Sequence, residues 1–242
     1  MPLVEFRDVC YQIADKAILS HVNFTLETGE TLVLLGRSGS GKTTALKMTN
    51  GLIFPTSGQV LVEGCPTEEW DPIRLKRRIG YVIQEVGLFP HFTVARNVGL
   101  VPVLEGWSRS DVEHRVDELL QLVGLAPADF RSRYPHQLSG GQKQRVGVVR
   151  ALAAGPSLLL FDEPFGALDP VTRRELQTQF LALNREFHTG SIFVTHDVRE
   201  ALRLGTHIAL LASGRIETLA APAEFRQAPG PETRAFLADL ED

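Results

Sequence analysis

The sequence predicts an α/β fold built around a parallel sheet. Four short runs consist mainly of apolar residues, which is typical of strands covered on both faces: residues 31–35, 157–161, 191–195 and 207–211. Stretches of helical character lie between most of these runs. Strands that alternate with helices favour parallel pairing in an α/β core.

The N-terminal part of the chain is predicted to contribute further strands. Residues 3–9 and 22–27 have strand character, a turn follows at 28–30, and residues 59–63 form another short strand. A helix is expected over residues 43–50, directly after the first buried strand and a glycine-rich loop.

About residues 85–154 differ in character and are predicted to be mostly helical. Ser110 is the expected N-cap of one helix in this stretch, and Gly124 is its expected stop. Between them, apolar residues recur at helical spacing: Val112, Val116, Leu119, Leu120 and Val123. Another helix is expected to begin at Asp169-Pro170. Residues 220–242 suffice for one or two helices, but not for an added domain.

Composition excludes some classes of function. Hydrophobic residues make up 43% and charged residues 22% of the 242 residues, as in ordinary globular proteins. The net charge of −4 gives no support to nucleic acid as a partner. No apolar run approaches the roughly 18 residues that a membrane-spanning helix needs. Any membrane role is therefore expected to require a separate partner chain.

A phosphate-binding motif follows the first buried strand. The sequence GRSGSGKT at residues 36–43 fits the P-loop pattern G-x-x-x-x-G-K-[ST] in the required strand-loop-helix context. Its backbone N–H groups are expected to hold phosphate oxygens, while Lys42 meets the β- and γ-phosphates and Thr43 ligates Mg²⁺. The predicted nucleotide-binding residues here are Gly36, Arg37, Ser38, Gly39, Ser40, Gly41, Lys42, Thr43 and Thr44.

Polar residues follow two other buried strands. Asp162 and Glu163 end the run at 157–161, and His196 ends the run at 191–195. Open α/β sheets bind their ligands at the carboxyl ends of strands. With a P-loop upstream, Asp162 is predicted to hold Mg²⁺, and Glu163 to orient and polarise an attacking water.

A second glycine motif, LSGGQ at residues 138–142, indicates a second anion site. Ser139 is a suitable N-cap for a helix that begins near Gln142, and free N–H groups at such a start attract anions. Two phosphate sites about a hundred residues apart could bind two nucleotides.

Together these motifs resemble the ATP-binding-cassette ATPases, along almost the whole chain. The resemblance implies that the P-loop of one subunit and Ser139, Gly140, Gly141 and Gln142 of a second copy enclose one ATP in a head-to-tail dimer. It also implies a P-loop NTPase core in residues 1–84 and 155–219 with an N-terminal antiparallel β subdomain. The remaining parts would be an inserted α-helical subdomain over about 85–154 and a short helical tail over 220–242.

The resemblance assigns four more roles. Gln84 corresponds to the Q-loop glutamine, which contacts Mg²⁺ and water at the hinge to the helical subdomain. His196 corresponds to the switch histidine that contacts the γ-phosphate. Tyr11 stands where an aromatic ring stacks on adenine, and Ala167-Leu168-Asp169 corresponds to the D-loop that touches the opposite subunit.

Two segments favour one kind of cassette ATPase. Residues 84–91 (QEVGLFPH) and 101–107 (VPVLEGW) look similar to ATPase subunits that power osmoprotectant uptake, with glycine betaine, choline and carnitine among the solutes. The resemblance implies a peripheral subunit at the cytoplasmic face of the membrane, a separate permease whose coupling helix docks near these segments, and indirectly a solute-binding protein.

Other readings stay open at this point. Importers of amino acids, phosphate or methionine share many of the same motifs, and an exporter subunit is a further alternative. A cassette ATPase without a transporter is disfavoured because long coiled-coil insertions and a second cassette are absent from the sequence. A kinase or GTPase would leave residues 138–142 unexplained, and the GTPase motif Asn-Lys-x-Asp does not occur.

Overall fold

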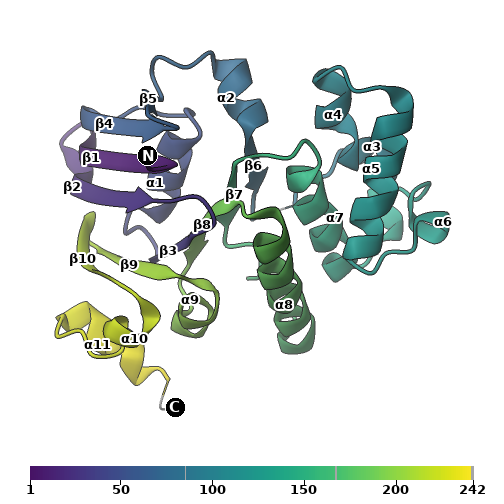
Figure 1. The fold of residues 1–242 in the computed structure, drawn as a ribbon. Helices are drawn as coiled ribbons and strands as arrows, with labels where there is room; N and C mark the ends of the chain where they lie inside the picture. Colours follow the sequence, from purple (N-terminus) through teal and green to yellow (C-terminus); the bar gives the residue numbers. More distant parts are fainter. Residues whose placement is uncertain (85, 167, 241–242) are drawn as a thin grey trace.

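The computed structural model describes residues 1–84, 86–166 and 168–240, which form two sheets with helices packed around them (Figure 1). The N-terminal sheet has the strand order β2-β1-β4-β5, and all its neighbours pair antiparallel. Its strands are β1 Val4–Ile13, β2 Lys16–Leu26, β4 Ser57–Val62 and β5 Cys65–Pro66.

The second sheet is the predicted parallel sheet, with the strand order β10-β9-β3-β8-β7-β6. Its neighbours pair in parallel except at one edge, where β10 runs antiparallel to β9. The four apolar runs become β3, β7, β8 and β9, so the prediction of an α/β core is confirmed. The strands are β3 Thr31–Leu35, β6 Ile79–Val82, β7 Leu158–Asp162, β8 Gly190–Thr195, β9 His207–Ala212 and β10 Arg215–Ala220.

The helices of the central stretch gather on one side of the molecule. In Figure 1, α3 to α7 lie away from the N-terminal sheet, and β6 and β7 lie between the two groups. The division of the chain into subdomains at these boundaries stays a prediction. The helices are α1 Lys42–Thr49, α2 Pro72–Arg78, α3 Val94–Val98, α4 Leu100–Leu104, α5 Arg109–Leu122, α6 Pro127–Phe130, the 3-10 helix η1 Pro135–Gln137, α7 Gly140–Leu152, α8 Pro170–Phe187, α9 Val198–Leu204, α10 Pro222–Phe225 and α11 Pro231–Ala238.

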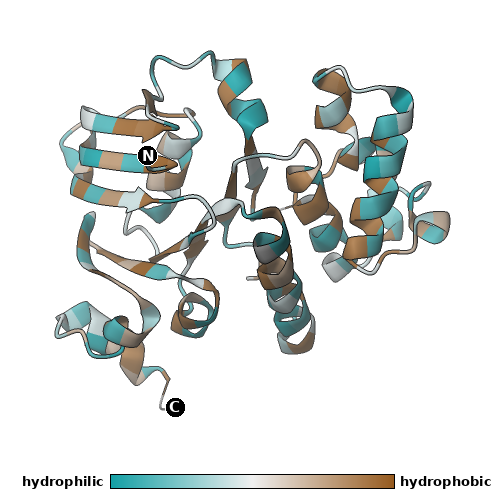
Figure 2. Ribbon diagram, viewed as in Figure 1, coloured by the Kyte–Doolittle hydropathy of each residue, from teal (hydrophilic) through white to brown (hydrophobic). Residues whose placement is uncertain are grey.

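Alternation along β3 explains why the core has two parts. Leu32 and Leu34 pack in one buried cluster with the N-terminal sheet and α1, whereas Val33 and Leu35 pack in another with the helices of the opposite face. Successive side chains of a strand point to opposite faces, so a strand covered on both faces must be apolar throughout. Helices at the surface differ from this buried strand, because only one side of each faces the core. Figure 2 shows hydrophilic and hydrophobic residues mixed along the surface helices α5 and α8.

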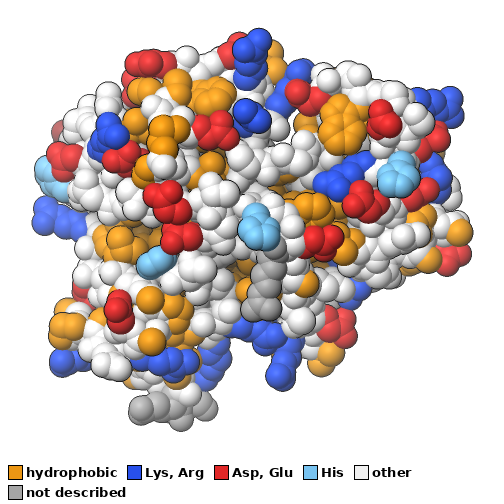
Figure 3. All heavy atoms as spheres, in the orientation of Figure 1, with side chains coloured by type: hydrophobic (Ala, Val, Ile, Leu, Met, Phe, Trp, Pro, Cys, Tyr) orange, Lys and Arg blue, Asp and Glu red, His pale blue; other side chains and the backbone are white. Residues whose placement is uncertain are grey.

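The surface of the molecule carries charged side chains of both signs. On the face shown in Figure 3, acidic and basic side chains are interspersed, in keeping with the small net charge of −4. Among the described residues, no helix combines the length and the apolar character that crossing a membrane requires.

Several strand boundaries differ from the prediction. β1 continues past residue 9 to Ile13, and β2 begins at Lys16, before residue 22. The two strands pair with each other as a hairpin in this region, although apolar and polar residues no longer alternate there. β6 and β10 were not predicted. β6 has only four residues and contains Gly80, where a Cβ would collide with the Ala151 carbonyl of α7.

The helix caps confirm two predictions and correct a third. Asp169 caps α8, and Gly124, with φ of +71°, follows the C-cap of α5. The N-cap of α5 is Ser108 rather than Ser110, because the Ser108 Oγ accepts the Asp111 N–H at 3.2 Å and donates to its carboxylate at 2.7 Å. Ser110 therefore lies in the first turn of α5. The spacing of apolar residues alone could not tell which of the two nearby serines is the N-cap.

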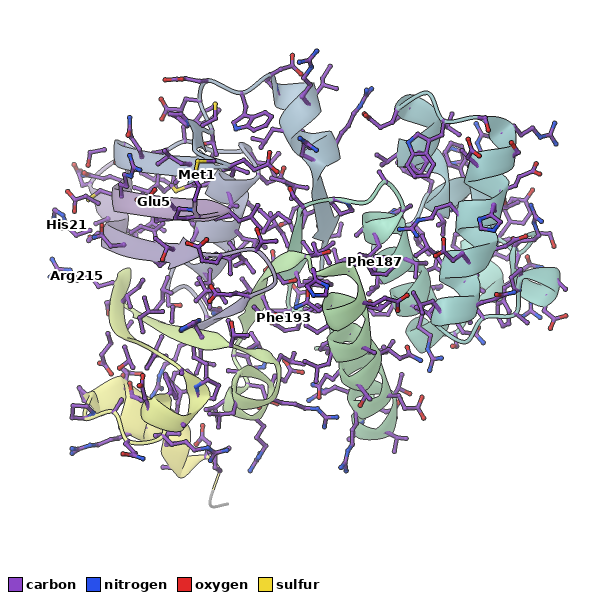
Figure 4. The ribbon with its side chains drawn as sticks, viewed as in Figure 1. Met1, Glu5, His21, Phe187, Phe193 and Arg215 are labelled. Carbon is purple, nitrogen blue, oxygen red and sulfur yellow. The ribbon has the colours of Figure 1, made fainter. Side chains whose placement is uncertain are left out.

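Phe193 offers a test of the core, because it is fully buried on β8 in the centre of the molecule (Figure 4). Its ring lies 5.5 Å from that of Phe161 and 5.4 Å from that of Phe165. We expect Phe193→Ala to lower the free energy of unfolding by about 3–5 kcal/mol through lost burial and a cavity, measured by urea unfolding. The exposed control Val171→Ala should change it by less than about 0.5 kcal/mol, and an equal effect of both would contradict this account.

Candidate active site

The predicted functional side chains converge because three parallel strands end at the same edge of the sheet. β3 pairs with β8, and β8 pairs with β7, all in parallel. The loop of residues 36–41 follows β3, Asp162 is the last residue of β7, and His196 follows β8. The structure therefore assembles at one edge residues that lie far apart in the sequence, where ligands of such sheets bind.

Backbone geometry makes residues 36–41 a tight loop at the start of α1. Gly41 has a φ of +105°, a conformation that favours glycine. A Cβ at this position would also lie 3.0 Å from the Ile18 carbonyl oxygen and 2.5 Å from the Leu19 side chain of β2. Because Gly41 has no side chain to cap α1, the first amide groups of the helix are left to bind an anion such as phosphate.

Two polar groups of the loop fit a phosphate ligand. The Lys42 Nζ donates to the Gly36 and Arg37 carbonyl oxygens at 2.7 Å and 2.9 Å, and these partners leave its positive charge unneutralised. Burial lowers the pKa of Lys42, while the nearby Glu163 and Asp162 carboxylates oppose that shift. The Ser40 Oγ is buried without a hydrogen-bond partner among the described residues, a deficit that a phosphate oxygen would satisfy.

A hydroxyl and a carboxylate lie together where Mg²⁺ is expected. The Thr43 Oγ1 donates to the Asp162 Oδ1 at 2.9 Å, and the Tyr81 hydroxyl lies 3.5 Å from the Asp162 Oδ2. Burial raises the pKa of Asp162, and the hydrogen bond from Thr43 partly offsets this shift. Oxygen donors of this kind suit Mg²⁺, so Thr43 and Asp162 fit the predicted metal role.

Glu163 and His196 form a pair at the same edge. The His196 Nδ1 lies 3.1 Å from the Glu163 Oε2. The Glu163 backbone is left-handed, with φ of +45°, and its N–H donates to the Val194 carbonyl oxygen of β8 at 3.1 Å. This conformation is uncommon for a residue other than glycine. It turns the chain between Asp162 and the following segment, and both Glu163 and His196 line one hollow of about 580 Å³.

The C-terminal tail forms another wall of this hollow, which sequence reasoning did not anticipate. Arg37 and Ser38 of the P-loop line it together with Ala235, Phe236 and Asp239 from α11 and its end. The tail is joined to the P-loop by an ion pair between Arg37 and Glu232, with 3.0 Å between Nε and Oε2. No sequence pattern marked this contact, because its partners are 195 residues apart.

The LSGGQ motif lies in a separate hollow of about 470 Å³. Ser139 caps α7: its Oγ accepts the Gln142 N–H at 3.3 Å, and the Gln142 Oε1 accepts the Ser139 N–H at 2.9 Å. Gly140, Gly141, Leu168 and Asp169 also line this hollow. Among the described residues, it shares no lining residue with the hollow of the P-loop. One chain therefore does not bring its own P-loop and LSGGQ motif together.

The remaining predicted positions are less closely tied to the site. Gln84 is exposed just beyond β6, and Tyr11 on β1 is half-buried against the core cluster of the N-terminal sheet. Asp169 accepts the Val171 and Thr172 N–H groups as the cap of α8. Ala167 lies outside the described residues. The roles of Gln84, Tyr11 and Asp169 stay predictions.

The fold and this edge of the sheet define a P-loop nucleotide-binding protein. Residues 19–166 match the family model described as "ABC transporter". The chain belongs to the ABC transporter family.

Two curated relatives are similar over most of the chain. The choline transport ATP-binding protein OpuBA of Bacillus subtilis is 46% identical over 217 residues, covering 90% of this chain and 57% of the relative. The osmoprotectant import ATP-binding protein OsmV of Salmonella typhimurium is 48% identical over 214 residues, covering 88% of this chain and 56% of the relative. The chain thus spans just over half the length of either relative.

A solved structure confirms the fold. It is described as the dimeric post-hydrolysis state of an ATP-binding cassette bound to ADP and Pi, and it superposes with a TM-score of 0.79 at 33% identity. The match covers 90% of this chain and 98% of that one.

Gly41→Ala tests the P-loop geometry. We expect at least a tenfold loss of nucleotide affinity, about 1.4 kcal/mol, because the methyl group would strain the backbone and push on Leu19. Binding of a fluorescent ATP analogue would measure the effect.

Gly106→Ala is the matched control. Gly106 also has a positive φ, +80°, but a Cβ there would have no neighbour within 4 Å. The control should keep its nucleotide affinity while losing about 1 kcal/mol of stability from backbone strain. Equal affinities for the two variants would refute the assigned geometry.

Proposed function

We propose that this chain is the ATP-hydrolysing subunit of a bacterial ABC importer for osmoprotectants such as glycine betaine, choline or carnitine. The observation that carries the proposal is the convergence of Lys42, the Thr43–Asp162 pair and the Glu163–His196 pair at one edge of the parallel sheet. These groups supply the charge, the metal ligands and the water-orienting carboxylate that hydrolysis of a nucleoside triphosphate needs.

Binding of the triphosphate is assigned to the P-loop. Amide groups at the start of α1 hold phosphate oxygens, and the Lys42 ammonium exchanges its carbonyl partners for the β- and γ-phosphates. Thr43 and Asp162 would hold Mg²⁺, which would supply positive charge next to the phosphate oxygens. Tyr11 is assigned to stack on the adenine ring.

Hydrolysis is assigned to Glu163 with His196. The Glu163 carboxylate accepts a hydrogen bond from a water molecule and aligns it with the γ-phosphorus, so that ATP and water give ADP and phosphate. The contact of 3.1 Å between His196 and Glu163 limits the positions that the carboxylate can take. Gln84 is assigned to contact the same water and would contribute a ligand to Mg²⁺.

The separation of the two hollows supports a head-to-tail dimer. Within one chain, Ser139–Gln142 and the P-loop line different hollows, so the LSGGQ motif must meet a γ-phosphate held by another copy. A twofold axis would then create two equivalent sites, each completed by its partner.

A groove between the sheet and the helices is the proposed permease site. It has a volume of about 350 Å³ and is lined by apolar and cationic residues that include Lys76, Arg77, Phe89, Val101 and Arg150. Nearby, Val103, Leu104 and Trp107 are exposed apolar side chains, which is the usual character of a protein contact surface. We therefore place the chain at the cytoplasmic face of the membrane beneath a permease, with a solute-binding protein acting on the other side.

The choice of solute rests on similarity. The two relatives described above are named for transport of choline and of osmoprotectants, at 46% and 48% identity. The solute itself need not touch this subunit, so the test must use the assembled transporter.

Glu163→Gln tests the chemical assignment. We expect ATP turnover to fall by at least about 100-fold, because the amide can no longer accept a proton or polarise water as a carboxylate does. Nucleotide affinity should stay within about threefold of the wild type, since the P-loop is unchanged. A phosphate-release assay and analogue binding would measure the two quantities.

Glu224→Gln, on the exposed face of α10, makes the same chemical change away from the site and should leave both quantities unchanged. Full turnover by Glu163→Gln would overturn the role of Glu163.

The transport assignment is tested by reconstituting the chain with its permease and binding protein in lipid vesicles. Stimulation of ATP turnover by glycine betaine, choline or carnitine supports the proposal. Stimulation only by an amino acid or an inorganic anion would keep the ATPase mechanism and replace the solute class.

A further inference from the structure

Arg150 attaches the segment after Gln84 to helix α7. Its Nη1 donates to the Gly87 carbonyl oxygen at 2.7 Å, and its Nη2 donates to the Val86 carbonyl oxygen at 2.8 Å. A planar guanidinium suits two such parallel contacts with consecutive carbonyl groups. Burial lowers the pKa of Arg150, yet a guanidinium stays charged, so both hydrogen bonds are charge-assisted.

Gly147, about one turn earlier on α7, lets the same segment lie directly on the helix. A Cβ added at Gly147 would collide with the Val86 Cγ1, whereas the Val86 Cβ itself would be 3.7 Å away, at ordinary contact distance. Glycine normally weakens a helix interior. Its presence at this position is therefore explained by the close approach of Val86.

The segment held by Arg150 leads directly to the groove that we assign to the permease. Phe89 lines that groove, and its N–H and carbonyl oxygen are both hydrogen-bonded to the Asn97 side chain, at 2.8 Å and 3.2 Å. Asn97 is fully buried, and its Nδ2 also donates to the Phe92 and Thr93 carbonyl oxygens. These hydrogen bonds connect the groove wall to the segment that Arg150 binds.

The other end of α7 carries the LSGGQ motif. Ser139 caps the helix 11 residues before Arg150, which corresponds to roughly 17 Å along a continuous α-helix. A rigid helix can carry coupling between its ends, so α7 links Arg150 near its C-terminus to Ser139–Gln142 at its N-terminus.

We propose that Arg150, seated by Gly147, is a positioning residue that couples the groove to Ser139–Gln142 of the same chain. This inference rests on the proposed function, because it specifies how permease docking would control closure of the LSGGQ motif on ATP. The proposed effect is an energetic coupling between the permease groove and the LSGGQ motif, carried by a series of direct contacts.

The first experiment uses the isolated chain and needs no transporter. Hydrogen exchange followed by mass spectrometry is compared for the wild type and Arg150→Lys. We expect at least fivefold faster exchange both at residues 86–97 and at residues 139–145. The lysine ammonium cannot reproduce the two parallel hydrogen bonds that the guanidinium makes to the Val86 and Gly87 carbonyl oxygens. Faster exchange at residues 86–97 alone would mean that Arg150 has only a local structural role and would overturn the coupling.

Arg115→Lys is the matched control for this experiment. Arg115 on α5 also donates to two carbonyl groups at the end of α7, those of Ala153 and Leu152, but among the described residues it makes no hydrogen bond to Val86 or Gly87. It should leave exchange at residues 86–97 unchanged.

The second experiment uses the reconstituted transporter and a rescue. Gly147→Ala should reduce solute-stimulated turnover at least fivefold, with no change in nucleotide affinity, because the new methyl group displaces Val86. Val86→Ala in the same chain removes the colliding atom and should restore stimulation.

The outcomes of the rescue separate this inference from the proposed function. Full stimulation in Gly147→Ala, or no recovery in the double variant, would refute the coupling. A wild-type transporter that no solute stimulates would refute the proposed function, and the exchange experiment would still decide whether the two ends of α7 are coupled.

Discussion

The parallel pairing of β3, β8 and β7 is the constraint on which the rest of the structure depends. In a parallel sheet, all carboxyl ends lie at one edge, and helices return the chain to the other edge. The P-loop, Asp162 and His196 therefore meet although more than 150 residues of sequence separate the first from the last. The same pairing requires apolar strands, because both faces of the sheet are covered.

A second consequence is that the P-loop and the LSGGQ motif lie in different hollows of the same chain. The hollow beside the P-loop contains Arg37 and the Glu163–His196 pair, whereas the LSGGQ hollow contains the capped start of α7. Both motifs are predicted to bind anions for the same physical reason, since amide groups at a helix N-terminus face outward. In the dimer that we propose, a second copy completes each site, so the relative position of the two motifs would set the rate of ATP turnover.

Helix α7 connects these features. Its first residues belong to the LSGGQ motif. Its last turn lies against β6 at Gly80, and Arg150 in this turn donates hydrogen bonds to the Val86 and Gly87 carbonyl oxygens. Glycines at two of these contacts remove side chains that would separate the elements. The tail adds a second long-range link, because the Arg37–Glu232 ion pair brings α11 to the P-loop.

The sequence by itself determined the features whose information is local. The four apolar runs predict the parallel strands, the P-loop pattern predicts its own loop and helix, and the positions of Asp162 and His196 at strand ends predict their shared edge. Only the tertiary structure decided the contacts between distant segments, such as Arg150 with Val86 or Arg37 with Glu232, because no periodicity relates their positions. It also decided that Ser108 caps α5, since two nearby serines have the same propensity and only the folded backbone distinguishes them.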